Sequence, residues 1–367
     1  MLVPLDIFGR QTGREERIRA GFIGCGSHAF RNVYPALRFT PTELVATCDL
    51  DADLAETFAK TFGADRWYTN HNEMLEKEDL DAVFIVTNYD ENGEPRHIKL
   101  AMDCMSAGCH AWVEKPPSAS SQEVLRAIEV SEKTGKFVLV GFKKCFFPAV
   151  EKAREISRYP EFGEISSITV RYPQTIPAQD CKGSLKGNGA LIGFLDHLCH
   201  PVSVLNYFCG PARTLFYRRN SIGGGAALFE FTNGVTGFLH FSAGQSGTSP
   251  LDRLEVVGRE ANVVVDNGVK LTYYRPGNRG PGGYGGSPSY IGDDAGAPMY
   301  WEPEFSLGQL YNKGLCMLGY YGEIASFVDC VRKNRPPAKC GLQDALEITK
   351  VYEAFLQPEG RVIEVNP

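Results

Sequence analysis

The first part of the chain alternates short apolar runs with helix-forming segments, and this alternation restricts the fold more than any other feature. Strand-like apolar runs end close to Gly24, Asp49, Thr87, Glu114 and Gly141, and segments with helical spacing lie between them. Strands that alternate with helices of this length indicate right-handed βαβ units and a parallel sheet. We therefore expect residues 1–141 to form one nucleotide-binding domain around a doubly wound parallel sheet.

The pattern changes after residue 141. A long apolar helix is expected at Gly189–Phe208, and short segments with alternating apolar residues dominate residues 213–274. Asn-Gly pairs separate some of these segments, which favours hairpins. Residues 142–367 are therefore expected to form an α+β domain with a large, mainly antiparallel sheet. Residues 275–298 are rich in glycine and proline and are expected to form an irregular loop.

The charge of the chain argues against large anionic partners. It has 38 basic and 44 acidic residues, a net charge of -6, so neither nucleic acid nor an anionic membrane surface is an expected partner. No apolar run has the length of a membrane span, and the N-terminus lacks the basic and apolar regions of a secretion signal. A cytoplasmic protein with a small-molecule ligand is the default expectation.

The segment Gly24-Cys25-Gly26-Ser27-His28-Ala29 lies between an expected strand and an expected helix, which is the context of the dinucleotide fingerprint. Gly24 and Gly26 permit a tight turn and a close approach of the backbone to a pyrophosphate, which faces the helix N-terminus. Ala29 replaces the third glycine, a variant that the fingerprint tolerates. His28 is either a phosphate contact or a histidine packed at the helix start. The turn predicts a dinucleotide site, although similar turns occur without a ligand.

A carboxylate ends the second strand. Asp49 follows the glycine turn at about the distance at which an acidic residue accepts the ribose 2′-hydroxyl of a dinucleotide. The same charge repels a 2′-phosphate, so NAD is expected rather than NADP. The alternative is a carboxylate that caps the following helix.

Glu114-Lys115-Pro116-Pro117 predicts a lysine held at the end of a strand. Proline cannot continue a ladder, so the strand stops there. Ligands of doubly wound sheets bind outside the carboxyl ends of the strands, which puts Lys115 at the same crevice as the glycine turn. A buried lysine near a positive ring can lose its proton and act as a base. The alternative is a surface lysine before a proline turn.

Asp196 and His200 are four residues apart in an expected helix and therefore share one face. A histidine titrates near neutral pH, so it can act as a general acid or base. His197 adds a second imidazole, but neighbouring side chains on a helix diverge by about 100 degrees, which disfavours a metal cluster. The alternative for His200 is a histidine satisfied inside a helical core.

Together these motifs resemble the Gfo/Idh/MocA oxidoreductase family, which includes glucose–fructose oxidoreductase and inositol dehydrogenase. The resemblance rests on the glycine turn, Cys48-Asp49, Thr87-Asn88 followed by His97, and Glu114-Lys115-Pro116. It implies a Rossmann domain that binds NAD and an α+β domain whose antiparallel sheet mediates a homodimer or homotetramer. It also implies oxidation or reduction of a carbinol carbon of a sugar, a glycoside or a cyclitol.

The resemblance further implies the roles of individual residues in cofactor binding. Lys115 contacts both the nicotinamide ribose and a substrate hydroxyl, and Glu114 helps to hold that end of the cofactor. Thr87 and Asn88 lie against the ribose or nicotinamide, and His97 belongs to the same cofactor-binding set. Family members usually have proline at or just after Thr87, a pattern from which this chain departs.

On the substrate side, the resemblance implies that Asp196 binds a hydroxyl and that His200 is a general acid or base. Lys143 stands where the family often has a polar residue of the active site, although a solvated basic pair with Lys144 is equally compatible with the sequence. Tyr172 and Gln174 follow a strand and are weaker candidates for contacts with sugar hydroxyls.

Three functions fit these features. The first is an NAD-dependent dehydrogenase that acts on a ring hydroxyl, with C3 of a glycoside as the position suggested by the resemblance. The second is a redox-neutral glycosidase that retains NAD, oxidises the sugar transiently and eliminates the aglycone. The third, a non-catalytic sensor, does not need Lys115, Asp196 and His200 together.

Overall fold

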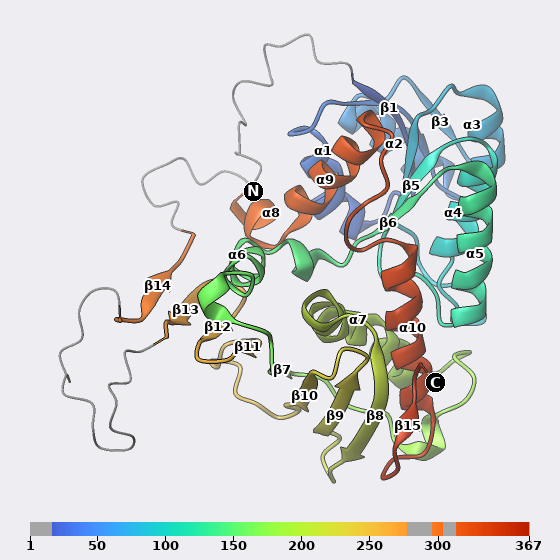
Figure 1. The fold of residues 1–367 in the computed structure, drawn as a ribbon. Helices are drawn as coiled ribbons and strands as arrows, with labels where there is room; N and C mark the ends of the chain where they lie inside the picture. Colours follow the sequence, from blue (N-terminus) through green and yellow to red (C-terminus); the bar gives the residue numbers. More distant parts are fainter. Residues whose placement is uncertain (1–16, 277–295, 304–312, 367) are drawn as a thin grey trace, which may run out of the picture. The chain divides into compact units, whose positions relative to one another are not determined.

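The structure is a computed structural model that describes residues 17–276, 296–303 and 313–366. Most of the stretch expected to be a loop, residues 277–295, lies outside the described part. The chain forms two compact units, coloured along the sequence in Figure 1. The first contains the chain through Lys143, then Ser184–Asn188 and Gly319–Thr349, and the remainder forms the second. A single division at residue 141 does not include this late return to the first unit.

The first unit is built on a six-stranded sheet with the order β3-β2-β1-β4-β5-β6, and the neighbouring strands are parallel. This is the order of a doubly wound dinucleotide-binding sheet, so the predicted parallel fold is confirmed. The strands are β1 (Ile18–Ile23), β2 (Thr42–Cys48), β3 (Arg66–Tyr68), β4 (Ala82–Ile85), β5 (His110–Val113) and β6 (Val138–Val140). The helical segments between them are η2 (Ala29–Val33), α1 (Tyr34–Leu37), α2 (Ala52–Phe62), α3 (His71–Lys77), α4 (His97–Ser106) and α5 (Ser121–Thr134).

The register of this sheet aligns the carboxyl ends of its central strands. Ile23 pairs with Cys48 and with Ile85, and Ile85 pairs with Val113. The residues that follow these strands therefore leave the sheet at one edge. That edge carries the glycine turn, Asp49, Thr87 and Glu114, all of which were predicted as site residues.

The C-terminal helices complete the first unit. Helix α9 (Tyr320–Arg332) packs against β1, β5 and η2. Phe327 of this helix is fully buried, and its ring lies 5.4 Å from that of Phe84 in β4, edge to face. Helix α10 (Leu342–Leu356) follows and belongs to this unit as far as Thr349, and the Cys340 carbonyl just before it accepts a hydrogen bond from the Val140 amide. This return brings Tyr320 to the first unit.

The second unit contains a nine-stranded sheet with the order β14-β13-β12-β11-β7-β10-β9-β8-β15. Strands β7 and β10 are parallel, and the other neighbouring pairs among the described strands are antiparallel, which confirms the predicted mainly antiparallel sheet. The strands are β7 (Ser167–Tyr172), β8 (Ala212–Arg219), β9 (Gly225–Phe231), β10 (Thr236–Phe241), β11 (Arg253–Val257), β12 (Asn262–Asp266), β13 (Lys270–Tyr274), β14 (Met299–Trp301) and β15 (Ile363–Glu364). The α-helices are α6 (Pro148–Ile156), α7 (Gly189–Cys209) and α8 (Lys313–Met317).

Helix α7 is the helix of the second unit that carries predicted site residues. It packs against β7, and its apolar side chains, including Leu195, Leu198 and Val202, are buried. Across residues 17–276, 296–303 and 313–366, no helix combines the length and the apolar character needed to span a bilayer.

Candidate active site

The two glycines of the turn after β1 meet different surroundings. Gly24 has a φ of 102°, and a Cβ atom added there would lie 1.8 Å from the Val86 carbonyl oxygen. The close approach of Val86, the residue after β4, therefore requires glycine at this position. A Cβ atom added at Gly26 would meet nothing within 4 Å among the described residues. No packing contact explains glycine there, and an open backbone surface is what a close-lying phosphate needs.

The Asp49 carboxylate is bound to the glycine turn. Its Oδ2 accepts a hydrogen bond of 2.7 Å from the Cys25 amide, and its Oδ1 accepts one of 3.0 Å from the Asp51 amide. Helix α2 is capped by Asp51, whose Oδ1 accepts from the amides of Asp53 and Leu54. The alternative role of Asp49 as the helix cap is therefore wrong. Asp49 stands half-exposed beside the turn, where it can receive a ribose hydroxyl.

Replacement of Asp49 by asparagine tests this cofactor assignment. The amide oxygen retains an acceptor for the Cys25 amide, but the charge that repels a 2′-phosphate is lost. We expect the preference for NADH over NADPH to fall by about tenfold, which corresponds to about 1.4 kcal/mol. Fluorescence titration of both nucleotides measures the two Kd values, and an unchanged ratio would contradict the assignment.

A chain of contacts connects the glycine turn to Lys115. The Nε2 atom of His28 lies 2.8 Å from Oε1 of Glu114, and the other carboxylate oxygen, Oε2, accepts a hydrogen bond of 2.7 Å from the Lys115 amide. Burial alone raises the pKa of the Glu114 carboxyl, but the His28 hydrogen bond and the charge of Lys115 outweigh it, so this pKa lies below its usual value. Glu114 is therefore an anion that holds the half-buried Lys115 segment and His28 together.

His97 joins the end of β4 to the segment after Lys115. The ring is buried, with Nδ1 2.8 Å from the Pro116 carbonyl oxygen, and Nε2 lies 3.1 Å from the Thr87 carbonyl oxygen and 3.4 Å from the Thr87 amide nitrogen. Burial lowers the pKa of His97, so the ring is neutral. A neutral ring carries one N–H, so it donates to only one of the two carbonyl oxygens, and the contact of Nδ1 with Pro116 is the shorter. The geometry is that of a residue that positions two loops.

The end of β4 carries a buried hydroxyl with no internal partner. The Oγ1 atom of Thr87 has no hydrogen-bond partner among the described residues, and Asn88 beside it is exposed. An unsatisfied buried hydroxyl requires an explanation, and a bound ligand supplies one. This hydroxyl, the open backbone at Gly26 and the carboxylate of Asp49 all lie at one edge of the sheet, and together they fit NAD.

Tyr320 is a contact that the sequence did not predict. Its hydroxyl oxygen accepts a hydrogen bond of 2.7 Å from Nζ of Lys143, and its ring meets the His28 ring edge to face at 5.8 Å. Burial raises the pKa of Tyr320 far above its usual value, so the hydroxyl keeps its proton. Lys143 is half-buried and Lys144 is 6% exposed, so they are not a solvated basic pair. The pattern of helix α9 gave no sign of this long-range contact.

In the second unit, α7 presents Asp196 and His200 one turn apart. His200 is 9% exposed, and its ring centroid lies 6.0 Å from that of Tyr172. Burial raises the pKa of the Tyr172 hydroxyl, and the negative charges of Asp252 and Asp196 raise it further. Tyr172, Asp196 and His200 are therefore neighbours. In the described part of the chain, no group of three histidine, cysteine, aspartate or glutamate side chains is arranged to hold a metal ion.

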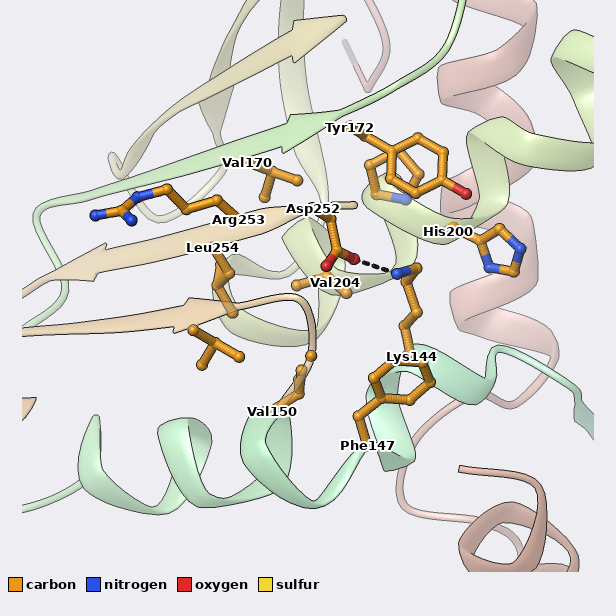
Figure 2. Close-up of a pocket in the computed structure, with 13 residues that line it drawn as sticks. Lys144, Phe147, Val150, Val170, Tyr172, His200, Val204, Asp252, Arg253 and Leu254 are labelled. Carbon is orange, nitrogen blue, oxygen red and sulfur yellow. Dashed lines mark hydrogen bonds and ion pairs between the residues drawn. The ribbon is translucent and has the colours of Figure 1, made fainter. Parts of the chain in front are cut away.

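A small cavity of ≈ 20 Å³ lies beside His200 and Tyr172 (Figure 2). This space is enough for about one water molecule. Lys144 forms an ion pair with Asp252 at its wall, and Nζ of Lys144 lies 5.3 Å from the centre of the Tyr172 ring. The sequence did not predict Asp252 as a site neighbour. The buried ion pair fixes one side of the pocket in which His200 stands.

Removal of the Lys144 charge should destabilise the second unit. In Lys144→Met, the Asp252 carboxylate, which is 17% exposed, loses its partner. The expected loss is about 3 kcal/mol in the free energy of unfolding, the lower end of the range for a broken buried pair, because Asp252 keeps some contact with water. The double variant Lys144→Met/Asp252→Asn should recover part of it. Urea unfolding measures both, and equal stability of the two variants would contradict the prediction.

Comparisons with known proteins match both parts of the chain. Residues 18–142 match the model of an oxidoreductase family with an NAD-binding Rossmann fold, and residues 150–264 match the model of the GFO/IDH/MocA C-terminal domain. A dTDP-3,4-didehydro-2,6-dideoxy-alpha-D-glucose 3-reductase from Actinomadura kijaniata is 27% identical over 66% of this chain and 73% of its own length. A scyllo-inositol 2-dehydrogenase (NAD(+)) from Bacillus subtilis is 25% identical over 68% of this chain and 74% of its own length.

The fold is also that of a solved structure. An oxidoreductase from Agrobacterium radiobacter, crystallised in complex with NAD+, L-tartaric acid and magnesium, superposes with a TM-score of 0.76. It covers 95% of this chain and 99% of its own, at 15% sequence identity. The matched domains, the strand order and the NAD-binding edge of the first sheet lead to one conclusion: the chain belongs to the Gfo/Idh/MocA family of NAD-binding oxidoreductases.

Proposed function

We propose that this protein oxidises or reduces a ring hydroxyl of a sugar, a glycoside or a cyclitol by hydride transfer, with C3 of a glycoside as the favoured position. The observation that carries the proposal is the contact of 2.8 Å between His28 and Glu114. It ties the glycine turn to the segment that holds Lys115, so that a lysine stands at the cofactor edge of the sheet. A binding module has no need of a lysine fixed in this way.

The residues that hold the cofactor lie in the first unit. Gly24 lets the turn pass close to Val86, Gly26 leaves the backbone open to the pyrophosphate, Asp49 receives a ribose hydroxyl, and Thr87 offers its buried hydroxyl. When bound, NAD supplies the acceptor or donor of the hydride. Ser27 and Ala29 begin the helix that faces the phosphates, with Ser27 exposed and Ala29 buried.

The proton chemistry belongs to Lys115, Asp196 and His200. Loss of a hydride from a carbinol carbon makes its oxygen acidic, and the imidazole of His200 takes or returns the O–H proton. The ammonium group of Lys115 stabilises negative charge on that oxygen or exchanges the proton itself. Asp196 accepts a hydrogen bond from a neighbouring hydroxyl and so orients the ring. Tyr172 and Lys143 are further contacts for substrate hydroxyls.

The test is NADH formation by the purified protein with a panel of free sugars, cyclitols, and O- and C-linked glycosides. Formation of NADH with one class of substrate supports the proposal and identifies that class. If no compound gives NADH, while nucleotide is released only on denaturation and an aglycone is liberated, the redox-neutral glycosidase replaces it.

The open face of the nine-stranded sheet supports a second proposal, a homodimer or homotetramer formed through it. Phe238 of β10 and Leu228 of β9 lie opposite each other and are 40% and 52% exposed. Adjacent exposed apolar side chains on a sheet face are typical of an interface. We expect Leu228→Lys/Phe238→Lys to shift the protein towards the monomer in sedimentation equilibrium. Val362→Lys, at a site 68% exposed, is the control. An unchanged mass would contradict the proposal.

A further inference from the structure

A larger cavity, of ≈ 450 Å³, lies in the second unit where β7 and β10 end and α7 begins. Tyr172 and Phe241 are paired at the ends of these parallel strands, so the segments that follow leave the sheet at the same edge. Gln174 from one segment and Gly244 from the other line the cavity, together with Gly189 and Gly193 of α7. Its volume lies within the range of roughly 300–1,000 Å³ that is typical of small-molecule pockets.

Gln174 supplies a buried acceptor to this cavity. The residue is 8% exposed, and its Nε2 atom donates a hydrogen bond of 2.9 Å to the Phe194 carbonyl oxygen. That carbonyl can only accept, which fixes the orientation of the amide group. The Oε1 atom has no hydrogen-bond partner among the described residues. A buried acceptor without an internal partner is suited to a donor from a ligand.

The start of α7 supplies donors and open space. The amide groups of its first turn, which begins at Gly189, have no acceptor within the helix. A Cβ atom added at Gly189 or at Gly193 would meet nothing within 4 Å among the described residues. Glycine is a poor helix former, so neither helix propensity nor packing explains these two residues. Their effect is to keep the wall of the cavity free of side chains.

The charge of the cavity selects the kind of ligand. No aspartate, glutamate, lysine or arginine is among the described residues that line it. His197 lines it as well, with Nδ1 2.9 Å from the Gly193 carbonyl oxygen. A phosphate or carboxylate would set its oxygens against Oε1 of Gln174. A hydroxyl group can donate a hydrogen bond to Oε1 of Gln174 and accept one from a backbone amide at the start of α7, so it suits both groups.

We propose that this cavity binds a second, neutral sugar unit, joined to the sugar that reacts. The inference rests on the proposed function. The His197 ring, at the cavity wall, has its centroid 6.4 Å from that of His200. The wall of the cavity is therefore close to the group assigned to proton transfer. The substrate is a disaccharide or a glycoside with a sugar-like aglycone, and not a free monosaccharide.

Calorimetric titration of the full chain without added NAD tests the proposal. The probes are α- and β-linked disaccharides of glucose, galactose and mannose, the corresponding methyl glycosides, and inorganic phosphate. In the wild type, at least one disaccharide should bind about tenfold more tightly than its methyl glycoside. This gain in affinity is what one or two additional hydrogen bonds from the second sugar unit contribute. Gly193→Leu, which fills the cavity, should abolish this gain, and Gln174→Met should reduce it. Gly183→Leu is the control, because a Cβ atom at Gly183 also meets open space.

The outcomes separate this inference from the proposed function. The inference is overturned if no disaccharide binds more tightly than its methyl glycoside, or if such a gain in affinity persists in Gly193→Leu. It is also overturned if phosphate binds to the wild type but not to Gly193→Leu. Both results hold regardless of which sugars yield NADH. If the gain is present and lost in Gly193→Leu, while no sugar yields NADH, the cavity is a sugar site and the proposed reaction is wrong. Thermal unfolding of each variant confirms that the loss of binding is not a loss of fold.

Discussion

The variant Lys115→Ala is expected to lower kcat by about 1,000-fold, within the range that removal of a group active in proton transfer produces. The Kd of NAD should change by no more than about tenfold, since a single hydrogen bond contributes about 1 kcal/mol. The reason lies in how the residue is held. Glu114 fixes the backbone of Lys115 through the amide, so truncation of the side chain leaves the contact with His28 in place.

Two controls make the Lys115 result interpretable. Lys60→Ala removes a lysine that is 73% exposed and pairs with Glu56 one turn earlier, and it should leave kcat unchanged. Lys115→Arg keeps a positive charge but cannot give up its proton near neutral pH. If Lys115→Arg is much more active than Lys115→Ala, the role of Lys115 is to stabilise an alkoxide with its positive charge. If the two variants are equally inactive, Lys115 itself takes or returns the proton. Wild-type kcat in Lys115→Ala would remove Lys115 from the mechanism.

The first sheet could be predicted from the sequence because its signals are local. Each of the longer strands contains a mostly apolar, buried run, and glycine marks the ends of α2 and α5, at Gly63 and Gly135, both with positive φ. Strand β3 was missed, since Arg66–Tyr68 has three residues, two of them exposed, and no apolar periodicity. The return of α9 to the first unit was also missed, because local patterns predict a helix but not its distant partner.

The candidate site shows the same limit. Asp49, Glu114 and Lys115 were predicted because each ends a strand, and strand ends in a parallel sheet share an edge. Tyr320 and Asp252 were not predicted, since their partners Lys143 and Lys144 lie more than 100 residues away in the chain. The sequence left two roles open for Asp49, and the structure excludes one of them, because Asp51 and not Asp49 caps helix α2.

Gly24→Ala should lower the stability of the fold and Gly26→Ala should lower the affinity for NAD, although only one residue separates the two positions. In Gly24→Ala, the new methyl group collides with the Val86 carbonyl at 1.8 Å in a backbone with φ of 102°. The left-handed conformation costs roughly 1–2 kcal/mol, and the forced shift of the neighbouring strand adds roughly 1–3 kcal/mol. We expect a loss of about 3 kcal/mol or more in the free energy of unfolding, measured with urea.

In Gly26→Ala, the methyl group meets open space, so the urea midpoint should match that of the wild type. The Kd of NAD should instead rise by about 10- to 100-fold, because hydrogen bonds to a charged phosphate contribute about 1.5–3 kcal/mol and the methyl group prevents the close approach that they need. Wild-type affinity in Gly26→Ala would place the pyrophosphate elsewhere. Because one glycine is required by the neighbouring strand and the other by no described residue, loss of stability in the first and loss of affinity in the second would separate the demands of the fold from those of the cofactor.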